Sequence, residues 1–263
     1  MDAFDILEKV RLEKPVVHHL TNWVTIYDCA NIVKVFGASP VMAHAKEEVA
    51  DMAKIASGLV LNIGTLTVDF IDSMIAAAKS ANEKGIPVVL DVCGAGATKL
   101  RDDMSFKILN SVKIDVIKGN ASEVARIAGE QVATKGVDSS DVEKDLIEIA
   151  KKLSGERKCC IVITGKEDIV YGNGKGYLIS NGCDMMGNVV GTGCMATSVI
   201  GAFVSVWDDI VDACAGALVC YEVAAEIANE TSKGPGSFKN NLFDSAFLLG
   251  RSDVKKRIKI KSL

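Results

Sequence analysis

The sequence predicts an α/β fold of three layers, in which a mainly parallel sheet lies between two layers of helices. Short apolar runs that end in glycine or aspartate alternate with amphipathic helical patterns, an order typical of strand-helix-strand units. The runs are also continuously apolar and rich in β-branched residues, as expected for strands buried on both faces. Because no linker or repeat interrupts this pattern, we expect a single domain over residues 1–263.

The elements follow from these patterns in chain order. An amphipathic helix, rather than a signal peptide, is expected at the N-terminus. The helix over 67–84 should stop at Gly85, a residue suited to ending a helix. The glycines of "GNGKG" predict an antiparallel hairpin at the sheet edge. Buried strands are expected at 58–64, 86–92, 114–120 and 159–165, the hairpin at 168–182, and further helices at 139–155 and 209–230.

Residues 188–207, "NVVGTGCMATSVIGAFVSVW", carry no charge and are about long enough to cross a bilayer. Glycine, threonine and serine dilute their hydrophobicity, two aspartates follow, and no Lys or Arg flanks them. We therefore expect a glycine loop followed by a helix buried in a globular core, with no membrane partner.

Composition excludes several other functions. Charged residues make up 24% of the chain and hydrophobic residues 49%, so the protein has enough apolar residues for a sizeable core. The net charge of -4 is spread out without a basic cluster, which argues against a nucleic-acid partner. None of the eight cysteines has CxxC spacing, so no zinc motif is present. Isolated cysteines are typical of a reducing compartment, and we expect a cytoplasmic protein.

Polar residues stand where the predicted strands end, and ligands of open parallel sheets bind at that edge. In "GTGC", Gly191, Thr192 and Gly193 precede a helix expected to begin near Cys194. Free amides in such a first turn bind phosphate, although an ordinary tight turn explains the same four letters. No Walker-type P-loop is present.

Two other strand ends allow a functional and a structural interpretation. Lys118 offers a cation, while Asn120 and Glu123 either form a capping box or bind a ligand. Together with Asp91, Glu123 has the carboxylate chemistry that a hydrated Mg²⁺ prefers. Thr164 either closes a polar turn or donates its hydroxyl to a nucleotide phosphate.

Six blocks occur in an order and spacing that resemble the hydroxyethylthiazole kinase family of the ribokinase-like superfamily. They cover roughly residues 15 to 250, and six ordered blocks are more specific than any one of them. Other ribokinase-like enzymes usually carry aspartate at the position of Cys194, so this cysteine favours the thiazole kinases. The blocks are "HHLTNWVTIYDCANIVKVFGASPVM", "DVCGAGATKLR", "IKGNASEV", "VITGKED", "GTGCMATSVIGAF" and "GPGSFKNNLFD".

The resemblance implies transfer of the γ-phosphoryl group of ATP to the primary alcohol of 4-methyl-5-(2-hydroxyethyl)thiazole, in thiamine biosynthesis and salvage. It also implies a homotrimer with the site between subunits, so that Asn22 and Met42 would face the "GTGC" of another chain. The residue roles that it implies are Asn22, Met42 and Gly191 at the thiazole, Lys118 and Thr164 at ATP, and Asp91 and Glu123 at the magnesium.

The chemistry of this set is coherent, because phosphoryl transfer depends more on positioning and charge neutralisation than on a strong base. At a helix N-terminus the Cys194 thiol should have a lowered pKa and accept the alcohol proton. Alternatively, Cys194 is a small residue that leaves room for the hydroxyethyl arm. We also assign Asn120 and Gly193 to the ATP site.

Two positions depart from the family pattern. The family usually carries Arg at the position of Lys118, and an ammonium cannot form the bidentate fork of a guanidinium, which predicts altered ATP binding. The family's "DPVGAGAT" is "DVCGAGAT" here, with Val92 and Cys93.

Alternative functions are another ribokinase-like activity, namely a hydroxymethylpyrimidine kinase or the hydrate dehydratase of nicotinamide nucleotides, and a nucleotide-binding regulator without turnover. Cys194 and "SPVM" at 39–42 disfavour the other enzymes, and the acidic pair Asp91 and Glu123 disfavours the regulator.

Overall fold

Within residues 2–130 and 139–263, nine strands form one sheet in the order β2-β1-β3-β4-β5-β6-β7-β8-β9. The computed structural model describes residues 2–130 and 139–263. In the helix over residues 139–157, side chains are described from residue 145 onward. Neighbours from β2 to β6 pair in parallel, and those from β6 to β9 pair antiparallel. The strands are β1 Val16–Leu20, β2 Ser39–Val41, β3 Gly58–Asn62, β4 Val88–Asp91, β5 Val116–Asn120, β6 Cys160–Thr164, β7 Asp168–Gly172, β8 Lys175–Ile179 and β9 Ile260–Ser262.

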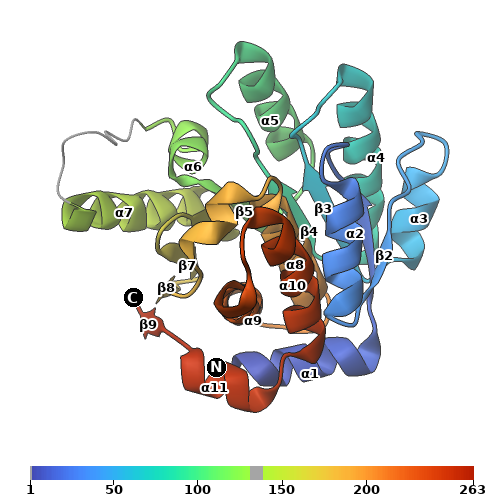
Figure 1. Cartoon of the computed structure of the whole chain (residues 1–263). Coiled ribbons are helices and arrows are strands. Elements are labelled where there is room, and N and C mark those ends of the chain that lie inside the picture. Colours follow the sequence, from blue (N-terminus) through green and yellow to red (C-terminus); the bar gives the residue numbers. More distant parts are fainter. Residues whose placement is uncertain (1, 131–138) are drawn as a thin grey trace.

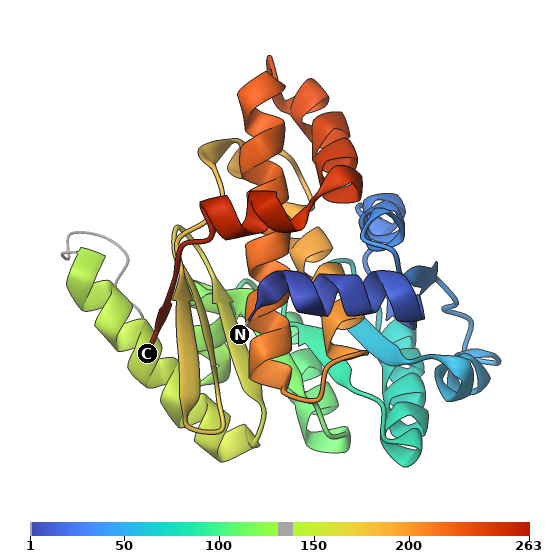
Figure 2. The same ribbon diagram turned by 90° about the horizontal axis from the view of Figure 1, so that it is seen from below.

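Helices cover both faces of this sheet (Figure 1 and Figure 2). Successive residues of each central strand join two different apolar clusters, because side chains alternate between the faces of a strand. The first cluster includes residues of α1 Ala3–Glu13, α2 Ile26–Val35, α8 Thr192–Val204, α9 Ile210–Thr231, α10 Pro235–Leu248 and α11 Arg251–Arg257. The second includes residues of α3 Val49–Ile55, α4 Val68–Lys84, α5 Lys99–Ser111, α6 Ala121–Ile127 and α7 Ser139–Arg157. The predicted α/β/α architecture is confirmed.

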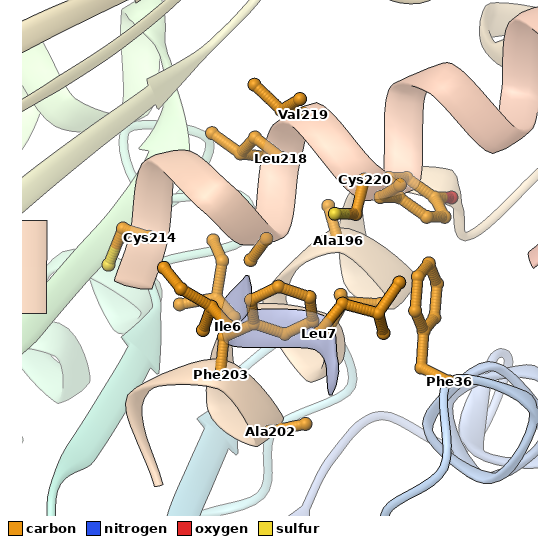
Figure 3. Close-up of a cluster of buried hydrophobic side chains, with 14 of the residues drawn as sticks. Ile6, Leu7, Phe36, Ala196, Ala202, Phe203, Cys214, Leu218, Val219 and Cys220 are labelled. Carbon is orange, nitrogen blue, oxygen red and sulfur yellow. The ribbon is translucent and has the colours of Figure 1, made fainter. Parts of the chain in front are cut away.

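Close packing fixes α8 over the sheet. A Cβ atom added to Gly201 of α8 would lie 2.3 Å from Cγ2 of Val60 in β3, so only glycine lets the helix approach this closely. On the outer side, Ile6 and Leu7 of α1 lie beside Phe203 of α8, and α9 passes over them (Figure 3). The N-terminus of α8 is thereby held above the carboxyl ends of the central strands.

Most of the predicted elements are present. The helix expected over 67–84 is α4, with Thr67 as its N-cap and Gly85 in the left-handed conformation at its end. The predicted hairpin is β7 and β8, but β8 does not form the sheet edge, since β9 from the C-terminus pairs with it. The hairpin prediction is therefore correct in form and wrong in its position at the edge.

The uncharged stretch begins at Asn188, the last residue of the short 3-10 helix η1 Asp184–Asn188, and its residues Thr192–Val204 form α8. Every residue of α8 from Met195 to Val204 is buried, as predicted for a core helix. Within residues 2–130 and 139–263, no helix combines the length and hydrophobicity that crossing a membrane would need.

Candidate active site

Three polar side chains form a row across neighbouring strands. In the register of the sheet, Asn62 of β3 pairs with Asp91 of β4, and Asp91 with Lys118 of β5. Two positions earlier on each strand, a valine belongs to the apolar cluster that contains α8. Because side chains alternate with period two, the polar row points to the same layer. The carboxyl ends of β3, β4 and β5 therefore present an amide, a carboxylate and an ammonium to α8.

The first turn of α8 supplies free backbone amides above this row. Gly191 is the N-cap, with a φ of 96° and no side chain to cap the helix. The first helical bond runs from the amide of Met195 to the carbonyl of Gly191, at 2.8 Å. The amides of residues 192–194 therefore precede the ladder of helical hydrogen bonds and carry the positive end of the helix dipole. Such a turn can hold a phosphate.

Cys194 lies in this turn and accepts hydrogen bonds from two amide side chains. Its Sγ atom is 3.2 Å from Nδ2 of Asn22 and 3.4 Å from Nδ2 of Asn62. The pKa of Cys194 is lowered to about 6, mainly by its interaction with the Cys93 side chain and against the opposing effect of burial. The same interaction, followed by burial, raises the pKa of Cys93. The lowered pKa favours the thiolate form of Cys194.

Lys118 and Asp91 form a buried ion pair under the glycine loop. The Lys118 Nζ atom is 3.4 Å from Oδ2 of Asp91 and 3.2 Å from the carbonyl oxygen of Gly193. The hydroxyl of Thr197, one turn further along α8, donates to the same carboxylate oxygen at 2.6 Å. Burial is the largest single influence and opposes the charge on Lys118, but the negative groups of Asp91, Cys194 and Glu123 together raise the pKa of the ammonium. This pair ties α8 to β4 and β5.

Glu123 is positioned by two backbone amides at the start of α6. One of its carboxylate oxygens accepts from the amide of Gly94 at 2.7 Å, and the other from the amide of Asn120 at 2.7 Å. The Asn120 side chain accepts from the amide of Glu123 at 3.0 Å, which completes the capping box. The capping interpretation of Asn120 is confirmed. Glu123 is thus fixed on the same strand-end edge as Asp91.

A cavity of about 560 Å³ opens beside the glycine loop. Thr164 lies in its wall and donates its hydroxyl to the carbonyl of Gly119 at 3.4 Å, while Thr192 and Gly193 line its boundary with α8. Two buried carboxyl groups, Asp168 and Glu222, line it as well. Burial is the main cause that raises the pKa of both, which favours their protonated forms. Lys166 and Asp184 line the same cavity, so charged as well as neutral side chains surround it.

The same arrangement of sequence and structure occurs in known proteins. The model of the hydroxyethylthiazole kinase family matches residues 7–250. A relative named hydroxyethylthiazole kinase from Methanosarcina mazei is 52% identical over 257 residues, which cover 98% of both chains. Another, from Methanosarcina acetivorans, is 53% identical over 249 residues, with 95% of both chains covered. The chain belongs to the hydroxyethylthiazole kinase family.

Solved structures agree with this membership in the hydroxyethylthiazole kinase family. The structure of a hydroxyethylthiazole kinase protein from Pyrococcus horikoshii OT3 matches with a TM-score of 0.92 and 36% identity, covering 99% of this chain and 98% of that one. A ribokinase-like superfamily protein from Enterococcus faecalis matches with a TM-score of 0.66 at 14% identity, covering 92% and 93%. The second match supports the fold alone, and the predicted ribokinase-like fold is confirmed.

The structure brings together most of the residues expected from the resemblance to the thiazole kinases. One prediction about the subunit arrangement is wrong for Asn22, because this residue contacts the Cys194 of its own chain. Met42 does not follow one of the strands that carry the polar row. It follows β2, and strand β1 lies between β2 and β3, where the row begins. The residues that gather around the start of α8 are Asn22, Asp91, Lys118, Gly191, Gly193 and Cys194.

Sequence reasoning missed several residues of this thiazole-kinase site. Asn62 ends a predicted strand, so its position was a signal that it belongs to the same row as Asp91. Glu222 was marked by being a lone acid in an apolar stretch of the helix over 209–230. Thr197 and Cys93 gave no comparable signal, because their roles depend on how closely α8 approaches β4.

Proposed function

We propose that this chain transfers the γ-phosphoryl group of ATP to the primary alcohol of 4-methyl-5-(2-hydroxyethyl)thiazole, in thiamine biosynthesis and salvage. Its membership of the thiazole kinase family supports the substrate, and the site supports the chemistry. The observation that carries the proposal is the free first turn of α8, which places amides, the Cys194 thiolate and the Lys118–Asp91 pair together. A loose phosphoryl-transfer transition state is stabilised mainly by such positioning and charge neutralisation.

In this proposal the residues of α8 have distinct tasks. The amides around Gly193 hold the transferring phosphoryl group, and Lys118 adds a positive charge directly beneath the loop. Cys194 accepts the proton of the alcohol as its oxygen attacks phosphorus. Asn22 and Gly191 bound the space in front of this thiolate, where we place the hydroxyethyl arm of the thiazole.

ATP is the co-substrate of a kinase of this family, and we place its phosphates along the glycine loop and its nucleoside in the cavity beside it. Thr164 and Gly193 line this cavity, and Lys118 lies below its edge. Asn120 follows directly from β5, where its exposed side chain can reach a phosphate that extends past the loop.

Asp91 and Glu123 are the residues that would hold Mg²⁺. Both carboxylates are fixed on the strand-end edge by hydrogen bonds, and each keeps lone pairs for a hard cation. In the part of the chain that the structure describes, no group of three or more His, Cys, Asp and Glu could hold a metal, which agrees with an ion that keeps several waters. When bound, Mg²⁺ would neutralise charge on the phosphates.

We further propose a homotrimer in the cytoplasm. Four large apolar side chains near the site are exposed, namely Trp23, Val24, Tyr27 and Val190. They are neighbours because Thr25 packs against Gly191. An interface between subunits would cover this surface and bring Met42 of a neighbouring chain to the site. The eight free cysteines are consistent with a reducing compartment.

The test is coupled ADP release with Mg-ATP and hydroxyethylthiazole, with the phosphorylated thiazole identified by mass spectrometry. We expect thiazole-dependent ADP release and that product. Hydroxymethylpyrimidine and a hydrated nicotinamide nucleotide serve as competing substrates for the alternative enzymes. ATP binding without turnover of any of the three would overturn the proposal in favour of a nucleotide-binding regulator.

A further inference from the structure

One arginine side chain connects the ends of two neighbouring strands of the site. Arg101 lies in the first turn of α5, and its guanidinium donates three hydrogen bonds to backbone carbonyl oxygens. Its Nη1 atom donates to Ile63 at 3.0 Å and to Cys93 at 2.8 Å, and its Nη2 atom donates to Gly64 at 2.8 Å. These acceptors belong to the segments that follow β3 and β4. The guanidinium therefore holds the two strand ends together.

The segment after β3 is linked to the two amides that donate to Cys194. The backbone amide of Gly64 donates to Oδ1 of Asn62 at 2.9 Å. A Cβ atom added to Gly64 would lie 3.0 Å from Cβ of Asn22, so the segment also packs closely against that side chain. Asn22 and Asn62 in turn donate to the sulfur of Cys194. A displacement of this segment would therefore move both donors.

The segment after β4 is linked to the two carboxylates assigned to magnesium. It begins directly after Asp91, and the backbone amide of Gly94 within it donates to Glu123 at 2.7 Å. Gly94 has a φ of 79°, and a Cβ atom there would lie 2.9 Å from Nη1 of Arg101. The guanidinium thus packs against the same turn whose amide orients Glu123.

A guanidinium suits this bridging role better than an ammonium does. It presents its N–H donors in a rigid planar fork, so one side chain can address several acceptors at fixed positions. A second arginine acts at the other end of the turn after β4. Arg126 bonds to Asp102 at 2.9 Å, and Asp102 accepts from the amide of Gly96 at 2.7 Å. The part of the turn that lies nearest to the strands is held by Arg101.

We propose that Arg101 is a positioning residue of the phosphoryl-transfer site, which keeps the ends of β3 and β4 at the spacing that their side chains need. The inference rests on the proposed function, because it extends the roles given there to Cys194, Asp91 and Glu123. Arg101 acts through Asn62 on one side and through the turn that orients Glu123 on the other. Removal of partners that orient metal ligands typically costs about 10–100-fold in metal affinity or activity.

Hydrogen exchange followed by mass spectrometry tests the bridge on the full-length protein without nucleotide or metal. Arg101→Ala should speed exchange in the peptides that contain Gly64 and Gly94, because their amides lose acceptors held in place. Peptides of β7 and β8 should exchange as in the parent. Lys99→Ala is the matched control, since Lys99 lies on the same turn of α5 and pairs with the exposed Asp103. Its exchange should equal that of the parent.

Steady-state kinetics test the consequence for the reaction. We expect Arg101→Ala to lower kcat by about tenfold to a hundredfold and to raise the Mg²⁺ concentration at half-maximal rate by about tenfold. The KM for ATP should stay near the parent value, because other segments line the cavity assigned to the nucleoside. Arg101→Lys keeps the charge without the fork and should show the same changes in smaller size, which provides the measurement if Arg101→Ala does not fold.

Unchanged exchange at Gly64 and Gly94 in the Arg101 variants would overturn the inference. A lower kcat with an unchanged magnesium dependence would do so as well, since a smaller folded fraction alone has that effect. The two measurements also separate this inference from the proposed function. If the parent phosphorylates no thiazole, the kinase assignment falls, and exchange still decides whether Arg101 holds both strand ends. If the parent is an active kinase and the Arg101 variants keep its kcat and magnesium dependence, only the inference falls.

Discussion

The sulfur of Cys194 accepts hydrogen bonds from the side-chain amides of Asn22 and Asn62, and its interaction with Cys93 is the main cause of its lowered pKa. Hydrogen bonds to the charged form of a group lower its pKa as a neighbouring cation does. A thiolate stabilised in this way can accept a proton, but it brings a negative charge close to the incoming phosphates. At the residue scale, the proposed mechanism therefore assigns proton transfer to Cys194 and charge stabilisation to Lys118 and the amides of α8.

This division of tasks predicts unequal losses on substitution. We expect Cys194→Ala to lower kcat by about a hundredfold, the loss of a general base. We expect Asp91→Asn to lower it by about a thousandfold or more, because charge stabilisation is usually the larger contribution. Steady-state rates at saturating Mg²⁺ and ATP measure both.

Asp91→Asn also leaves Lys118 without its buried partner, which costs roughly 3–5 kcal/mol of stability. Urea unfolding shows whether the variant is folded. Glu123→Gln serves as a second variant that keeps the buried ion pair intact, and its kcat should fall further than that of Cys194→Ala. The ranking is wrong if Cys194→Ala is the most damaging of the three.

The thiolate itself can be titrated. Alkylation of Cys194 by iodoacetamide, followed on its own peptide without nucleotide or magnesium, should speed up as the pH rises through about 6 and then level off. The direction follows because the pKa is lowered, so the reactive form dominates above that pH. Cys93→Ala removes the largest cause of the shift, and its inflection should lie at higher pH. An inflection near that of an ordinary thiol in both proteins would contradict the hydrogen-bond explanation.

At the scale of elements, the turn that leads into α8 requires glycine at position 191 for two reasons, its backbone conformation and its close packing. Gly191 has a φ of 96°, and a Cβ atom there would lie 2.5 Å from Cγ2 of Thr25. A left-handed conformation costs an L-residue about 1–2 kcal/mol, and overpacking costs about 1–3 kcal/mol. The loop that presents the amides therefore tolerates no side chain at this position.

We predict that Gly191→Ala lowers the free energy of unfolding by about 1–3 kcal/mol or displaces the loop and lowers kcat/KM. Gly155→Ala is the matched control, because a Cβ atom at Gly155 in α7 meets nothing within 4 Å, its φ is not positive, and it lies outside the cavity assigned to the nucleotide. Urea unfolding and steady-state kinetics of both variants provide the measurements. Equal behaviour of the two alanines would refute the steric and conformational explanation.

Elements that local sequence patterns define could be predicted from the sequence, whereas elements that depend on contacts with distant segments could not. Asp91 follows an apolar run, and Lys118 follows the shorter pair Val116 and Ile117, so their place near the strand ends followed from local patterns. By contrast, β2 and β9 are three-residue strands with little periodic signal, and pairing with distant segments defines them. The contact of Asn62 with Cys194 depends on Gly201 letting α8 approach β3, a distance that no local pattern encodes.

At the scale of the whole molecule, the two sides of the site differ, because one is formed within a single chain and the other exposes apolar side chains. The cavity lined by Thr164 and Gly193 lies within one chain. On the other side, the half-exposed Trp23 and the exposed Val190 flank the space in front of Cys194. A monomer would leave this apolar surface in water, whereas a ring of subunits buries it. The assembly should therefore complete the thiazole side and leave the nucleotide side unchanged.

Mixed oligomers test this arrangement. In a trimer in which Met42 reaches a neighbour's site, the inactive variants Met42→Glu and Asp91→Asn should complement each other when co-expressed with different tags. In a mixed trimer of either composition, one site in three combines an intact Asp91 with an intact Met42 from the next chain, so about a third of the parent activity should return in the doubly purified protein. Native mass spectrometry of the doubly purified protein checks that the trimers are mixed. If each site used the Met42 of its own chain, no site would be intact and the mixture would stay inactive, while a monomer in the same spectrum would rule out the ring itself.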